Sequence, residues 1–203
     1  MRSPWLQKYL RTPDEYIWGR EPSSFAREAA EFLPPGARVL ELGCGEGRDS
    51  VFFGSLGFEV IGVDSAAPGI QKAERLAREH GVAVRWVTAD MGEIDPAGPF
   101  DLVYSCGAVH YVPRADRDRL LRETKARTRP GGLHAHIVFT DREIYVELGE
   151  VIDYFRPGEL RELYADWAIL IREEGTINCA QDGNPHRHSV ETLIARRPHP
   201  PVV

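Results

Sequence analysis

The chain has 203 residues, of which 42% are hydrophobic, so it is long enough to bury a substantial core within one domain. A net charge of -6 argues against a protein whose main partner is a nucleic acid, because that affinity depends on Lys and Arg neutralising phosphates. The three cysteines form no CxxC pair, and no apolar run reaches signal-peptide length or the ~20 residues of a membrane span. These features predict a cytoplasmic protein that is neither exported nor embedded in a membrane.

From about Phe25 onward, helical and strand-like patterns alternate along the chain. The predicted strands are residues 38–42, 59–63, 82–88, 101–105 and, after a Pro-Gly-Gly turn at 130–132, residues 134–140. The helices predicted between them span residues 25–33, 51–56, 67–80 and 113–128. Because strands that alternate with helices form right-handed βαβ units, this order predicts an α/β fold with a mainly parallel sheet covered on both faces.

The pattern changes toward the end of the chain. After a helix around residues 157–163, two β-patterned runs at 167–177 and 187–196 are separated only by the polar loop 178–186. So short a link predicts an antiparallel hairpin at the sheet edge. We expect residues 25–197 to form a single domain, with residues 1–24 as an N-terminal arm or lid and residues 198–203 as a frayed tail.

A basic stretch runs from Arg114 to Arg129, where seven basic residues outnumber three acidic ones. Leu120 and Leu121 interrupt it, which is typical of an amphipathic helix. We interpret the stretch as a helix with a solvated basic face rather than as a surface for a nucleic acid.

A glycine turn, Gly43 to Gly47, joins the first predicted strand to a helix, at the sheet edge where open α/β folds bind ligands. Its spacing is GxGxG, and Arg48 stands where a dinucleotide-binding turn has its last glycine, which counts against NAD. Asp64 ends the second strand, where an acidic residue accepts bonds from ribose hydroxyls. Asp90 and Met91 follow the third strand, suited to an adenine amino group and ring. Each feature alone is compatible with an ordinary turn or helix cap.

Taken together, the motifs VLELGCGEGRDS, VIGVDSA, TADM and RPGG resemble those of class I S-adenosylmethionine-dependent methyltransferases. The resemblance implies a Rossmann-like, doubly wound, seven-stranded sheet, mainly parallel with an antiparallel last strand. It also implies S-adenosylmethionine as cofactor and S-adenosylhomocysteine as product. The segment FRPGEL, together with Tyr164, Trp167 and the ending LIARR, is similar to the tellurite-resistance and thiol-methyltransferase-like branch.

This resemblance and the motifs together indicate a set of cofactor-binding residues. The N-terminal aromatic and basic side chains are either a lid over the methionine end of the cofactor or a staple between arm and core. The complete set is Tyr16, Trp18, Arg20, Glu41, Gly43, Cys44, Gly45, Arg48, Asp64, Ser65, Asp90, Met91 and Ser105.

Three histidines are the candidate acceptor-orienting residues. His186 and His188 begin the last strand at the cofactor edge, and residues two apart point to one face. They are interpreted as a proton acceptor, an oxyanion clamp with Arg187, half a metal site, or simply an exposed hairpin end. His110 follows the fourth strand, whereas His134 and His136 lie at the opposite edge and are expected to be structural. No metal site is predicted.

The sequence therefore predicts methyl transfer to a small-molecule acceptor by in-line displacement, with a thiol or chalcogen oxyanion as the expected class because soft nucleophiles need no base. The resembling branch supplies His and Arg from the loop before the last strand pair, but residues 175–179 contain neither, so tellurite is expected only if His186, Arg187 and His188 replace them. A hydroxyl or nitrogen acceptor, or a non-catalytic cofactor-binding protein, are the alternatives. No nucleic-acid or membrane partner is expected, and oligomeric state is not predicted.

Overall fold

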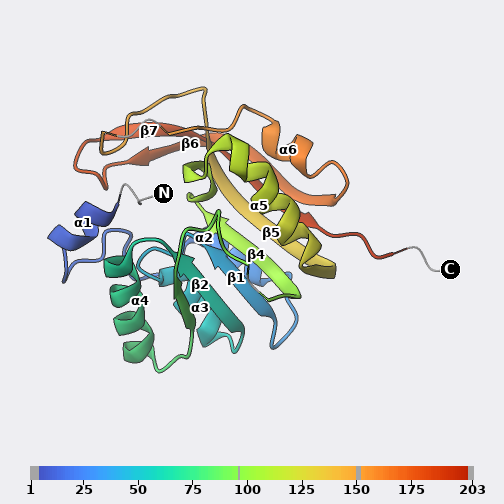
Figure 1. The fold of residues 1–203 in the computed structure, drawn as a ribbon, viewed down its shortest axis with the longest axis horizontal. Coiled ribbons are helices and arrows are strands. Elements are labelled where there is room, and N and C mark those ends of the chain that lie inside the picture. The colour runs from blue at the N-terminus through green and yellow to red at the C-terminus, as the bar shows by residue number, and fades with distance from the viewer. Residues whose placement is uncertain (1–4, 96, 150–151, 201–203) are drawn as a thin grey trace.

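The computed structural model describes residues 5–95, 97–149 and 152–200, and its main feature is a seven-stranded sheet (Figure 1). The strands lie in the order β3-β2-β1-β4-β5-β7-β6. Pairing is parallel from β3 to β5, and β7 lies antiparallel to both β5 and β6. The strands are β1 (Arg38–Leu42), β2 (Glu59–Asp64), β3 (Arg85–Thr88), β4 (Phe100–Cys106), β5 (Thr128–Thr140), β6 (Ala168–Cys179) and β7 (His186–Arg196). The predicted fold class is confirmed.

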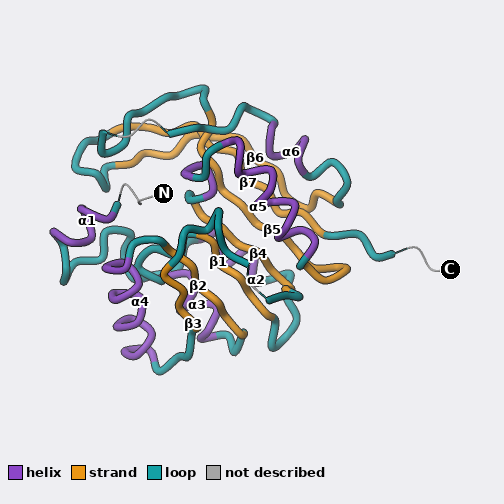
Figure 2. The backbone as a smooth tube through the Cα atoms, in the orientation of Figure 1, coloured by secondary structure: helices purple, strands orange, loops and turns teal. Residues whose placement is uncertain are grey.

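Helices precede the first strand and connect most of the others, as Figure 2 shows. They are α1 (Leu6–Arg11), α2 (Ser24–Ala30), α3 (Arg48–Ser55), α4 (Ala67–His80), the 3-10 turn η1 (Val109–Tyr111), α5 (Arg114–Ala126) and α6 (Glu159–Leu163). Among the described residues, no helix is long and apolar enough to cross a membrane.

Burial on both faces of the sheet follows from the alternation of side chains along each strand. Val39 packs with α2 and α3 on one face, and its neighbour Leu40 packs with α5 and α6 on the other. Both side chains are fully buried, as a mainly parallel sheet requires. This double covering leaves the carboxyl ends of the strands as the accessible edge for a ligand.

The structure differs from the sequence prediction at several element boundaries, most clearly in β3, β5 and β6. β3 begins at Arg85 rather than at residue 82, and the predicted turn at residues 130–132 lies within β5. β6 extends to Cys179 and pairs with β7 up to His186, so the connecting loop is shorter than predicted. The N-terminal helix α1 was not predicted. Residues 1–4 and 201–203, at the ends of the predicted arm and tail, lie outside the described residues.

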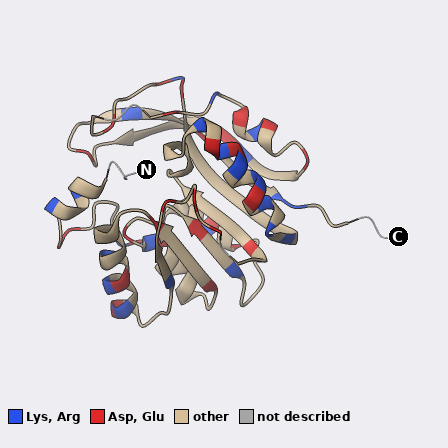
Figure 3. Ribbon diagram, viewed as in Figure 1, with Lys and Arg blue, Asp and Glu red and all other residues tan. Residues whose placement is uncertain are grey.

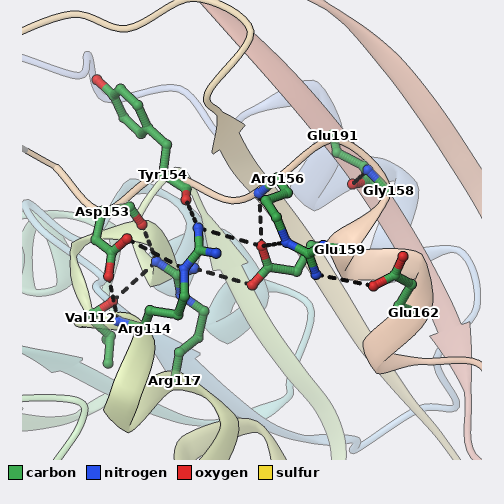
Figure 4. A network of polar contacts seen from close by, with 10 residues as sticks. All are labelled: Val112, Arg114, Arg117, Asp153, Tyr154, Arg156, Gly158, Glu159, Glu162 and Glu191. Carbon is green, nitrogen blue, oxygen red and sulfur yellow. Dashed lines mark hydrogen bonds and ion pairs between the residues drawn. The ribbon is translucent and has the colours of Figure 1, made fainter.

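The prediction of a solvated basic face on α5 is wrong for one side chain. Arg117 is fully buried, and its guanidinium lies 3.8 Å from the centre of the Phe155 ring. It also lies 3.6 Å from the carboxylate of Glu159 (Figure 4). Arg117 also donates to the backbone oxygen of Val112 at 3.2 Å. The rest of α5 carries both acidic and basic residues (Figure 3). Arg117 therefore anchors α5 to the segment before α6.

Candidate functional site

A cavity of about 270 Å³ lies at the carboxyl edge of the parallel strands. Ten of the thirteen predicted cofactor-binding residues line it: Trp18, Glu41, Gly43, Cys44, Gly45, Arg48, Asp64, Ser65, Asp90 and Met91. The other side of its wall is mainly apolar and comes from β5, β6 and β7: Ile137, Phe139, Ile177, Cys179, Val190 and Thr192. The cavity thus has an acidic end and an apolar end.

The glycine turn is built so that the backbone itself forms the wall. Gly43 has φ +72°, and a Cβ at this position would lie 2.2 Å from the Cβ of Ala108, so only glycine fits. The backbone N–H groups of Gly43 and Cys44 donate to the oxygen of Val63 at 2.8 and 2.9 Å. These bonds fix the turn to the end of β2. A ligand can therefore approach the backbone closely at this point.

Asp64, the last residue of β2, supports the glycine turn while lining the cavity. Its carboxylate accepts from the backbone N–H of Gly45 at 2.9 Å and from that of Ala66 at 2.8 Å. Burial raises the pKa of this carboxyl, and the two backbone hydrogen bonds act in the opposite direction. Since a carboxylate has about four acceptor positions, Asp64 can still accept from a ligand hydroxyl.

Two further acidic groups border the acidic end. Asp90 accepts from the backbone N–H of Gly92 at 2.9 Å, and this bond fixes the loop that also places Met91 on the wall. Glu41 is buried and accepts from the hydroxyl of Ser50. Burial, followed by the nearby carboxylate of Asp49, raises the pKa of Glu41 well above its usual range. A cation bound at this end would favour the charged form of Glu41.

The N-terminal segment closes the cavity from outside. The backbone N–H of Trp18 donates to Glu46 at 3.0 Å, and Arg48 donates to the backbone oxygen of Trp18 at 2.7 Å. Glu46 is held in turn by a buried ion pair with Lys72 at 2.8 Å. Trp5 contacts Trp18 edge to face at 4.7 Å. The arm is thus hydrogen-bonded to Glu46 within the glycine turn and to Arg48 directly after it.

Three predicted cofactor residues lie outside the cavity wall. Tyr16 packs beside α3 and α4, and its hydroxyl donates to the backbone oxygen of Lys72 at 3.0 Å. Arg20 forms an exposed ion pair with Glu79. Ser105 is buried in β4. Cofactor contact by these three side chains stays a prediction that the cavity does not support.

His186 and His188 lie together, as their spacing predicts. Their Nε2 atoms are 2.8 Å apart, and His188 is fully buried against Phe139 with ring centres 3.9 Å apart. Burial lowers the pKa of His188 to about 4, with the neighbouring His186 as a second cause. Neither ring lines the cavity beside the glycine turn, but Cys179, which pairs with His186 across the hairpin, does.

His110 stacks on the opposite side of the Phe139 ring system, at 4.1 Å between centres. Its Nδ1 accepts from the backbone N–H of Phe139 at 3.2 Å, so the neutral ring carries its proton on Nε2. Burial is the main cause of a pKa well below the usual range for histidine. His110 is therefore a neutral hydrogen-bond donor behind the apolar wall.

Sequence reasoning missed several wall residues. Tyr9 lies in the unpredicted helix α1 and Trp5 directly before it, and the buried pair of Glu46 with Lys72 joins residues far apart in the chain. No local pattern reveals such contacts. Cys179 could have been found, because a hairpin with a short loop places its strand-end residues opposite one another.

Comparison with known proteins gives the site a context. Residues 39–132 match the family described as methyltransferase domain. Hemagglutinin 1 of Eikenella corrodens is 26% identical over 86% of this chain and 59% of that protein. The ubiquinone biosynthesis O-methyltransferase of Agrobacterium fabrum is 33% identical over 63% of this chain and 51% of that protein. The probable S-adenosyl-L-methionine-dependent methyltransferase TehB of Haemophilus influenzae is 23% identical, covering 84% of this chain and 60% of that protein.

Solved structures share the fold. TehB from Haemophilus influenzae superposes with a TM-score of 0.76 at 23% identity, covering 86% of this chain and 62% of that one. The Burkholderia thailandensis 1,6-didemethyltoxoflavin-N1-methyltransferase, solved with bound 1,6-didemethyltoxoflavin and S-adenosylhomocysteine, has a TM-score of 0.72 at 24% identity and covers 96% of this chain and 85% of that one. This chain spans 51–60% of the length of the three relatives above. Residues 39–132 thus match a methyltransferase domain, and the fold of this chain is that of solved methyltransferases.

Proposed function

We propose that this protein transfers the methyl group of S-adenosylmethionine to a small-molecule acceptor, and that the acceptor is a soft nucleophile, a thiol or a chalcogen oxyanion. The observation that carries the proposal is the division of the cavity into an acidic end beside the glycine turn and an apolar end beside β5, β6 and β7. The first suits the cofactor, and the second suits an acceptor that reacts without a base.

The residues of the acidic end fit a nucleoside that bears a cation. Asp64, Asp90 and Met91 all line this end, which supports a role of Asp64 in binding ribose hydroxyls and of Asp90 with Met91 in binding adenine. The turn from Gly43 to Gly45 lets the methionine part lie against the backbone. When bound, S-adenosylmethionine supplies a methyl group activated by a positively charged sulfonium. Because the product has lost that charge, the carboxylates favour the cofactor over the product.

The apolar end argues for a nucleophile that needs no proton acceptor. Among the described wall residues of β5, β6 and β7, none has a carboxylate or an imidazole. His188, with a pKa of about 4, is a weak base near neutral pH. A thiol instead loses its proton to solvent, and its sulfur forms a bond to the methyl carbon as the bond to the sulfonium breaks. The protein then needs only to hold that sulfur in line with the bond between the methyl carbon and the sulfonium.

Acceptors of other kinds are the competing proposal. The relatives include an O-methyltransferase and the solved structures an N1-methyltransferase. His110 and His188, next to the apolar wall, could orient a hydroxyl or nitrogen acceptor by hydrogen bonds. The cytoplasm remains the expected compartment, since the three free cysteines suit reducing conditions.

An acceptor panel tests the proposal, with S-adenosylhomocysteine as the measured product. Thiols and chalcogen oxyanions are expected to give product, whereas phenols, alcohols and amines are not. Turnover confined to the second group would contradict the soft acceptor. Cofactor binding without product across the whole panel would instead favour a non-catalytic binding protein. Repeating the panel with His188→Gln should raise the KM for the acceptor and leave that for the cofactor unchanged if His188 orients the acceptor.

A further inference from the structure

A cysteine and two histidines meet at the loop end of the β6–β7 hairpin. Cys179 and His186 are direct partners in the antiparallel register, and His188 lies two residues further along β7. Directly paired residues, and residues two apart on one strand, point to the same face of a sheet. One ligand atom from each of the three side chains lies within 4.8 Å of the others.

The hydrogen bonds of His186 leave a lone pair pointing at His188. Nδ1 of His186 lies 2.6 Å from the backbone oxygen of Asn184, which can only accept, so Nδ1 carries the proton. In the neutral ring Nε2 is then unprotonated, and this atom lies 2.8 Å from Nε2 of His188. The two imidazoles therefore meet through a single shared proton, at a place that a metal ion can take.

Aromatic side chains hold both imidazole rings in place. Tyr145 stacks on His186 with 3.6 Å between ring centres and 4° between planes, and its hydroxyl donates to Asp182 at 2.5 Å. Phe139 stacks on His188. Asp182 also lies 3.6 Å from Nδ1 of His186. A carbonyl or carboxylate behind a histidine, with the ring fixed, is the usual surrounding of a metal-binding imidazole.

We propose that Cys179, His186 and His188 bind a divalent metal ion of borderline softness, Zn²⁺ above all. One thiolate and two imidazoles suit zinc rather than calcium or magnesium, which prefer oxygen ligands. Tetrahedral zinc with bonds of about 2.0–2.1 Å to nitrogen needs about 3.3 Å between two imidazole nitrogens. The two Nε2 atoms must therefore separate by roughly half an ångström, a shift within reach of a hairpin end.

The proposed metal site has an open coordination position and lies next to the cavity. Three protein ligands leave the fourth tetrahedral position open to water or to a small molecule. Cys179 lines the apolar end of the cavity beside the glycine turn, so one ligand of the metal site faces the place proposed for the acceptor. The metal site rests on the hairpin geometry alone and does not depend on the proposed methyl transfer.

Metal binding to the full-length chain without an affinity tag tests this proposal, with no cofactor or acceptor present. Zinc titrated against a chromophoric chelator is expected to bind one ion per chain. Cys179→Ser and His186→Asn should each weaken the affinity on the order of 100-fold or more, since even indirect partners of a metal contribute 10- to 100-fold. His80→Gln, on α4 and outside the trio, is the matched control and should bind as the unsubstituted chain does.

Cobalt supplies a measurement on the unsubstituted protein, which does not depend on how well a variant folds. The unsubstituted protein with Co²⁺ is expected to show a thiolate-to-cobalt charge-transfer absorption, and Cys179→Ser should lack it. Failure of the unsubstituted chain to bind zinc at one ion per chain would overturn the site. So would zinc affinity that is the same in Cys179→Ser, or a cobalt spectrum without the thiolate band.

Discussion

The carboxylate of Asp64 accepts a hydrogen bond from the backbone N–H of Gly45 at 2.9 Å, which joins the end of β2 to the turn that follows β1. The same carboxylate lines the cavity. One side chain thus shapes the glycine turn and faces the ligand. A change at Asp64 should therefore alter cofactor affinity more than a change at any other single carboxylate of the wall.

Asp64→Asn is expected to weaken binding of S-adenosylmethionine by about tenfold to a hundredfold. The amide keeps the size of the carboxylate but loses charge-assisted hydrogen bonds, which contribute roughly 1.5–3 kcal/mol each. Titration calorimetry measures the effect. Glu59→Gln, at the exposed start of the same strand, is the control and should leave affinity unchanged. Equal affinity in Asp64→Asn and the unsubstituted chain would show that Asp64 does not contact the cofactor.

Gly43→Ala should lower the free energy of unfolding by more than the same change at Gly57. Both glycines have positive φ, so both variants pay about 1–2 kcal/mol for a left-handed alanine. At Gly57 a Cβ meets nothing within 4 Å, whereas at Gly43 it would lie 2.2 Å from Ala108. We expect roughly 1–3 kcal/mol of further loss at Gly43 from overpacking, measured by denaturant unfolding without ligand. Equal losses in the two variants would contradict the close packing of the turn.

Arg117→Ala is expected to destabilise the fold by about 3–5 kcal/mol. The change removes one of the positive charges that pair with the buried carboxylate of Glu159, and it removes the contact with Phe155. Arg119→Ala, on the same helix but with a side chain 42% exposed, should change stability by less than about 0.5 kcal/mol. Thermal and urea unfolding of the two variants compare them directly. A loss at Arg117 as small as that at Arg119 would mean that the network in Figure 4 contributes little.

Stability should fall as the pH is lowered below about 6.5. Burial lowers the pKa of His136 from 6.5 to about 3, and it lowers that of His134 as well. Between these values the unfolded chain binds protons that the folded chain does not, so stability is fully present above pH 6.5 and decreases toward pH 3, by up to about 1.4 kcal/mol per pH unit for each group. His136→Gln should reduce this slope, and the exposed His80→Gln should affect it less. An unchanged slope in His136→Gln would show that the buried His136 does not cause the pH dependence of stability.

The fold followed from the sequence because its signals are local. Strand and helix periods, the glycine turn, and the acidic residues Asp64 and Asp90 at strand ends all lie within short segments, and the carboxyl ends of parallel strands share one edge. Contacts between distant segments were not predictable in this way. The burial of Arg117 depends on Phe155 and Glu159, and the partnership of Cys179 with His186 depends on the register of the hairpin.

The contacts of the N-terminal arm could not be predicted from its sequence either. Its aromatic residues suggested either a lid or a staple. In the structure, Trp18 lines the cavity wall and Tyr16 packs beside α3 and α4. Tyr16 therefore joins the arm to the core as a staple would, and a lid formed by Trp18 stays a prediction. Composition alone could not assign these positions to the two side chains, because the positions depend on the path of the chain after α1.

Calorimetric titration of the full chain with S-adenosylmethionine and, separately, with NADH tests the central claim most directly. S-adenosylmethionine is expected to bind in the micromolar range and to be displaced by S-adenosylhomocysteine. NADH is expected to give no heat, because Arg48 replaces the last glycine of a dinucleotide turn. Binding of NADH in the absence of any affinity for S-adenosylmethionine would contradict that claim.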